Sequence, residues 1–114
     1  MFICNIAGFN IAIRNRYTSF ELLCSDYFVS NVEYDFYIRL EKEELNEELA
    51  NSDDDYNLNY IEEIATLRKI AEWLPLHGAF VLHSATFDVD GVGVAFAAHS
   101  GTGKTTHMKL WQQI

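Results

Sequence analysis

The stretch of the chain with the clearest capacity for chemistry is AHSGTGKTT, residues 98–106. It combines two glycines, one lysine and two threonines within a few positions. The phosphate-binding pattern G-x-x-x-x-G-K-[ST] is met from Gly103 onward, with Ala98 standing where the pattern has its first glycine. In such a loop, successive backbone N–H groups turn inward around an anion, and a following helix start adds unpaired donors. The pattern predicts a phosphate-binding P-loop.

Each residue of this stretch has an expected role. We expect Lys104 to reach the β and γ phosphates of ATP, and the hydroxyl of Thr105 to bind Mg²⁺. The residues expected to surround the nucleotide phosphates are Ala98, His99, Ser100, Gly101, Thr102, Gly103, Lys104, Thr105 and Thr106. The alternative is a solvent loop of the same composition. A strand-like run at 94–97 and an amphipathic segment at 105–113 favour the P-loop, because the motif requires a strand before it and a helix after it.

A β-hairpin is predicted immediately before this loop. Asp-Gly at 90–91 separates two strand-like runs, and this pair tolerates the positive φ angles of a type I′ turn. If Val89 faces Val92 without a bulge, His83 falls across from Ala98, at the start of the loop. His83 is therefore a candidate active-site residue. The structural alternative is a strand histidine that is hydrogen-bonded to a neighbour.

The sequence LHSATFDVDGVGVAFAAHSGTGKTT, residues 82–106, resembles the HPr kinase/phosphorylase and phosphoenolpyruvate carboxykinase superfamily. The likeness extends over residues 60–114 and is nearest to HPr kinase-related, carboxykinase-like bacterial proteins. It implies a carboxykinase-like nucleotide-binding domain with ATP and Mg²⁺ as cofactors. It also implies that Lys104 contacts phosphate, that Thr105 binds the metal, and that His83 is the active-site histidine, so that His83 and Lys104 are the catalytic candidates.

The resemblance implies an ATP-dependent, kinase-like phosphotransferase whose acceptor is a protein or a small molecule. In this superfamily the aspartates that bind metal and act as acid or base lie well downstream of the loop. Asp88 and Asp90 belong to the remote end of the hairpin and do not replace them. We therefore expect residues 1–114 to be the amino-terminal part of a longer protein, and not catalytically complete. The alternative is a non-enzymatic relic or protein-interaction module with an idle P-loop.

The expected fold class is α/β (α+β), with two domains. Residues 1–57 form a β-rich, mostly antiparallel leader with an acidic connector, and residues 58–114 begin the P-loop domain. Strands are expected in 2–6, 9–13, 20–23, 27–29 and 34–40, and a solvated helix or mobile connector in 41–57.

An amphipathic helix is predicted over residues 60–74, with Asn59 and Glu62 as a capping box and Pro75 beyond its end. Its expected apolar face, widened by Ile70 and Trp73, consists of Tyr60, Ile64, Leu67, Ala71 and Leu74.

The formal net charge of −9 arises almost wholly from residues 41–63, which hold ten acids and one base. The charge argues against nucleic-acid binding and suits a solvated face or, alternatively, a docking segment for a basic partner. The chain contains no long apolar run or secretion signal, so no membrane association and a cytoplasmic location are expected. Cys4 and Cys24 are expected to be buried thiols in strands. An exposed strand edge makes a homo-oligomer possible.

Overall fold

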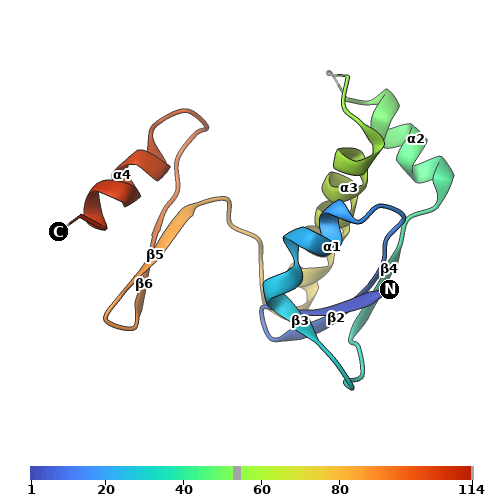
Figure 1. The fold of residues 1–114 in the computed structure, drawn as a ribbon, viewed down its shortest axis with the longest axis horizontal. Helices are drawn as coiled ribbons and strands as arrows, with labels where there is room; N and C mark the ends of the chain where they lie inside the picture. The colour runs from blue at the N-terminus through green and yellow to red at the C-terminus, as the bar shows by residue number, and fades with distance from the viewer. Residues whose placement is uncertain (53–54, 114) are drawn as a thin grey trace. The chain divides into compact units, whose positions relative to one another are not determined.

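The computed structural model describes residues 1–52 and 55–113 and divides into two compact units, the first spanning Met1–Ala79 and the second beginning at Phe80 (Figure 1). The fold is a mixture of helices and strands, as expected for the α+β class. In chain order the elements are β1 (Phe2–Ile6), β2 (Phe9–Arg14), α1 (Ser19–Leu23), η1 (Ser25–Tyr27), β3 (Phe28–Val29), β4 (Phe36–Arg39), α2 (Lys42–Ala50), α3 (Leu58–Trp73), η2 (Leu74–His77), β5 (Ala85–Val89), β6 (Val92–Phe96) and α4 (Lys104–Trp111). Among the described residues, no helix is long and apolar enough to cross a membrane.

The first unit is built on a four-stranded sheet with the order β3-β1-β2-β4. Strands β1 and β2 form a hairpin around Ala7 and Gly8, which both take positive φ angles of 54° and 86°. Strand β3 is antiparallel to β1, whereas β4 runs parallel to β2. The prediction of a mostly antiparallel sheet is therefore confirmed, with β4 as the parallel exception.

Helices α1 and α3 cover one face of this sheet. Phe20 of α1 and Ile70 of α3 join a core whose other members are Phe2, Cys4, Ile11, Ile13, Cys24, Ile38 and Leu74. The prediction of a strand at residues 20–23 is wrong, because this segment is helical. Only Phe20 of it is buried, while Leu22 is 72% and Leu23 is 61% exposed, so one aromatic anchor suffices to hold a single short helix.

Helix α3 differs from the prediction in its start and in its buried face. Asn57, and not Asn59, caps the helix, since its side chain accepts a hydrogen bond from the amide of Tyr60 at 3.0 Å. Tyr60 and Leu67, assigned to the apolar face, are exposed. The buried residues of the helix are Ile61, Glu62, Ala65, Thr66 and Ile70. The face is rotated because two polar residues, Glu62 and Thr66, lie inside it.

Of the two alternatives for the acidic segment, a solvated helix or a mobile connector, the structure has a helix over part of it. This is α2, which buries Leu45 and packs along α3. Leu40, Leu45, Ile61 and Ala65 form a second small core. Two ion pairs link the helices: Nη1 and Nη2 of Arg68 both bind the carboxylate of Glu48 at 2.6 Å, and Lys69 binds Glu44 at 2.6 Å. Bases on α3 thus offset part of the acidity of α2. The prediction for residues 53–54 lies outside the described residues.

The division between units falls after Ala79, whereas the sequence analysis places the boundary between residues 57 and 58. The physical reason is that α3 and the following residue Leu74 contribute to the core of the first unit.

Both cysteines are free and buried, as expected. Cys4 lies in β1, but Cys24 follows α1 and is not in a strand, which corrects that part of the prediction.

Candidate functional site

The hairpin β5–β6 forms the frame of the candidate site in the second unit. Asp90 and Gly91 adopt φ angles of 50° and 82°, as a type I′ turn requires, and the amide of Gly91 donates to Oδ1 of Asp88 at 3.0 Å. Val89 pairs with Val92, so the predicted register is confirmed. The ladder ends at the pair of Ala85 and Phe96. His83 and Ala98 therefore lie beyond it and do not form a strand pair.

The segment between β6 and α4, residues 97–103, is a turn-rich loop that we term the glycine loop. The amide of Thr102 and its hydroxyl both donate to the carbonyl oxygen of His99, at 3.4 and 2.8 Å. Gly101 sits at the third position of this turn with a φ of 82°, and Gly103 has a φ of 90°. A Cβ atom at either glycine would meet no other atom within 4 Å. The need for glycine here is therefore conformational and not steric.

Helix α4 begins directly at the end of the glycine loop. Gly103 is its N-cap residue and supplies no side-chain cap. The first intrahelical bond runs from the amide of His107 to the carbonyl of Gly103 at 2.9 Å. The amides of Lys104, Thr105 and Thr106 precede that bond, so helix geometry leaves them without intrahelical acceptors. These donors and the positive end of the helix dipole favour an anion at this point.

The side chain of Lys104 folds back over the glycine loop. Its Nζ donates to the carbonyl oxygens of Ala98 and His99 at 2.8 and 3.2 Å. These carbonyls are neutral partners, and no carboxylate among residues 1–52 and 55–113 forms an ion pair with the ammonium group of Lys104.

A hollow of about 330 Å³ brings most of the predicted site residues together. It is lined by His83, Ser100, Gly101, Gly103, Lys104, Thr105 and Thr106. A second hollow on the loop, of about 410 Å³, includes Ala98, Thr102 and His107 in its lining. His99 lines neither hollow and contributes its carbonyl oxygen instead. Strand pairing does not hold His83, yet His83 still reaches the first hollow from the segment that precedes β5.

The candidate metal ligand Thr105 lies in the first hollow, and no Asp or Glu lines that hollow. Among residues 1–52 and 55–113, no cluster of three or more histidine, cysteine, aspartate or glutamate side chains could hold a metal ion. A single hydroxyl fits Mg²⁺ that also takes oxygens from phosphates and water, which is its usual mode in nucleotide sites.

An aromatic cluster beneath α4 is the part of the site that the sequence analysis did not identify. Phe87 stacks on Phe96 at a ring distance of 5.7 Å and approaches Trp111 at 6.2 Å. His107 meets Phe96 edge to face at 4.6 Å, and its Nε2 accepts a hydrogen bond from Nε1 of Trp111 at 3.1 Å. The four-residue spacing of His107 and Trp111 on a helix is the signal that could have revealed this contact. The cluster anchors α4, and hence the glycine loop, on the hairpin.

Comparison of the chain with protein-family models, with curated proteins and with solved structures found no match.

Proposed function

We propose that the glycine loop binds the phosphates of ATP together with Mg²⁺. One observation carries the proposal: two glycines with positive φ, the ammonium group of Lys104 and the open first turn of α4 all border the same hollow. Each of these features favours a bound anion, and a polyphosphate is long enough to use all three. The resemblance of residues 82–106 to carboxykinase-like nucleotide loops supports the same ligand.

In the proposed complex, the backbone amides from Gly101 to Thr105 surround the phosphate chain. Lys104 exchanges its carbonyl partners for phosphate oxygens, which are stronger acceptors because they are charged. The Thr105 hydroxyl is the proposed protein ligand of Mg²⁺, which when bound neutralises charge on the phosphates. His83, at the rim of the hollow, is the proposed polar contact to the transferred group or its acceptor.

We further propose that the chain belongs to an HPr kinase-related, carboxykinase-like phosphotransferase. A phosphoryl-transfer site usually contains a carboxylate or another group that orients the acceptor. No carboxylate lines the hollow formed by the described residues. For the residues that line this hollow we therefore propose nucleotide binding. We propose phosphoryl transfer only for a site that also contains a group to orient the acceptor.

The experiment is a titration of the ¹⁵N-labelled chain with Mg-ATP, followed by the backbone amide resonances. The proposal predicts saturable shifts at Gly101, Gly103 and Thr105, and no such shifts when Mg²⁺ and adenosine are added at the same concentrations. Equal shifts with adenosine, or none in the glycine loop with ATP, would contradict it. Binding without hydrolysis or transfer would favour the alternative of an idle nucleotide loop.

A further inference from the structure

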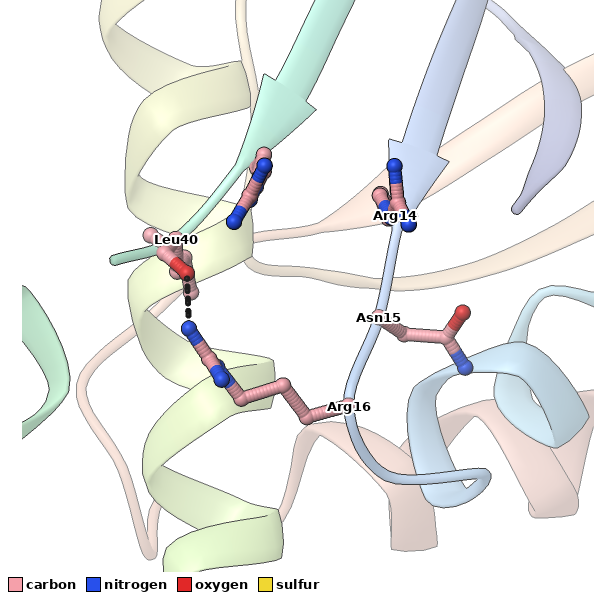
Figure 2. Close-up of a pocket in the computed structure, with 5 residues that line it drawn as sticks. Arg14, Asn15, Arg16 and Leu40 are labelled. Carbon is pink, nitrogen blue, oxygen red and sulfur yellow. Dashed lines mark hydrogen bonds between the residues drawn. The ribbon is translucent and has the colours of Figure 1, made fainter. Parts of the chain in front are cut away.

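Three arginines gather at the ends of β2 and β4 in the first unit. Arg14 is the last residue of β2, Arg39 is the last residue of β4, and Arg16 follows two residues after Arg14. The parallel register pairs Arg14 directly with Arg39. Paired residues on neighbouring strands point to the same face of a sheet, with backbones about 4.8 Å apart. Figure 2 shows Arg14 and Arg16 on the strand and loop that run past Leu40.

These side chains surround a small pocket of about 190 Å³, which we term the arginine pocket, lined by Arg14, Asn15, Arg16, Arg39 and Leu40. A hydrogen bond of 3.2 Å from Nη2 of Arg16 to the carbonyl oxygen of Leu40 holds the Arg16 side chain in place (Figure 2). The side chain of Asn15 points away from Leu40 (Figure 2). Its Nδ2 donates to the carbonyl of Tyr17 at 2.7 Å and to the carboxylate of Glu21 at 3.1 Å. The pocket therefore presents guanidinium groups.

The guanidinium groups of the arginine pocket are only partly paired with carboxylates. Arg39 pairs with Glu41 at 3.2 Å, and this ion pair is half exposed. The Arg16 side chain donates to a neutral carbonyl, and the Arg14 side chain has no hydrogen-bond or ion-pair partner within the described part of the chain. The carboxylate of Glu62 binds the backbone amides of Arg16 and Tyr17. Glu21 is the third glutamate near the pocket. Of the three, only Glu41 binds a guanidinium group, so those of Arg14 and Arg16 have no carboxylate partner among the described residues.

Like charges that face each other on adjacent strands destabilise a sheet, and a bound anion would remove this cost. Guanidinium groups bind the oxygens of phosphate through two parallel hydrogen bonds. A phosphate group carries a charge of about −1.5 to −2 near neutral pH, which suits two guanidinium groups without a carboxylate partner. We propose that the arginine pocket binds a phosphate group, either inorganic phosphate or the phosphate of a small monoester. This site is independent of the glycine loop.

The test is a titration of the full chain with inorganic phosphate at constant ionic strength, monitored at the amides of Asn15, Arg16 and Leu40. We expect saturable shifts there, and an affinity about fivefold weaker in each of the variants Arg14→Gln and Arg39→Gln, since each removes a charged, bidentate donor. Lys109→Gln is the control, because it removes the same charge from an exposed position in α4. Lys104→Met should leave these shifts unchanged, which separates the arginine pocket from the glycine loop.

Three results would overturn the proposal: no saturable shift at the arginine pocket, equal weakening by Lys109→Gln, or acetate binding as tightly as phosphate. If circular dichroism shows that Arg14→Gln is unfolded, Arg14→Lys takes its place. Arg14→Lys keeps the charge but loses the planar fork, so weaker phosphate binding is again expected, and unchanged binding would contradict the proposal. Titrations with glucose 6-phosphate and with glucose distinguish the two phosphate sources. Tighter binding of glucose 6-phosphate than of inorganic phosphate, with no binding of glucose, would identify a monoester as the ligand.

Discussion

The Nζ atom of Lys104 lies 2.8 Å from the carbonyl oxygen of Ala98, six residues earlier in the chain. This hydrogen bond links the first residue of α4 to the start of the glycine loop. It holds the positive charge of Lys104 at the site where we propose that the phosphates bind. Because this bond is exposed to solvent, it contributes little to the stability of the fold. The main effect of this hydrogen bond is to fix the position of the Lys104 ammonium group.

Replacing Lys104 by methionine should therefore affect binding far more than folding. We expect the affinity for Mg-ATP to fall at least about tenfold, since a charge-assisted contact to phosphate is lost. The thermal unfolding temperature should remain almost unchanged. Isothermal titration calorimetry on Lys104→Met and on the control Lys109→Met measures the difference, and equal affinities in the two variants would argue against the assigned role of Lys104.

Gly103 should tolerate alanine poorly although space is available for a methyl group. Its φ of 90° lies in the left-handed region, which costs a residue with a Cβ about 1–2 kcal/mol. We expect Gly103→Ala to speed hydrogen exchange of the His107 amide, which is bonded to the carbonyl of Gly103. Gly93→Ala is the control, because Gly93 has open space and no positive φ. Similar exchange rates in both variants would show that the strain is absent.

Glu62 is a buried carboxylate with a structural task in the first unit. It is 3% exposed and accepts hydrogen bonds from the amides of Arg16 and Tyr17 at 2.8 and 3.0 Å. Glu62→Gln replaces one accepting oxygen by an NH₂ group, which then faces a backbone N–H. This change should lower the free energy of unfolding by about 2 kcal/mol. Glu63→Gln, at the next position, should change it by less than about 0.5 kcal/mol. Urea denaturation of both variants tests this, and the account fails if they lose equal stability.

Stability should fall in alkaline solution because of Cys4. Burial raises the pKa of the Cys4 thiol from 9.0 to about 12, with Cys24 as a secondary cause. Above pH 9 the unfolded chain loses this proton while the folded chain keeps it, so unfolding becomes easier as pH rises toward 12. The Cys4→Ala variant is less stable throughout but lacks this dependence. Its free energy of unfolding should decline less steeply above pH 9 than that of the native sequence, and parallel curves would contradict the assignment.

The hairpin of the second unit could be predicted from sequence because its determinants are local. Asp90 and Gly91 specify the turn, and the turn then fixes every pair from Val89 and Val92 to the end of the ladder. The positions of Lys104 and of the start of α4 follow from the same short stretch. His83 does not pair with Ala98 as the register suggested, because the ladder ends before it, but it lines the same hollow as Lys104.

Errors arose where distant contacts decide the structure. The buried face of α3 includes Glu62, whose partners lie in the loop after β2, and no apolar periodicity within the helix can reveal such a contact. Residues 20–23 are apolar enough for a strand, but only Phe20 enters the core. The arginine pocket depends on the parallel pairing of β2 with β4, and sequence patterns near Arg14 or Arg39 do not specify that pairing.

The most direct test of the nucleotide proposal is a crystal structure of the chain grown with Mg²⁺ and a non-hydrolysable ATP analogue. The account predicts triphosphate density enclosed by the amides of residues 101–105, with Nζ of Lys104 moved from the carbonyl of Ala98 to a phosphate oxygen. A glycine loop without bound triphosphate at saturating analogue, with Lys104 still on that carbonyl, would contradict it.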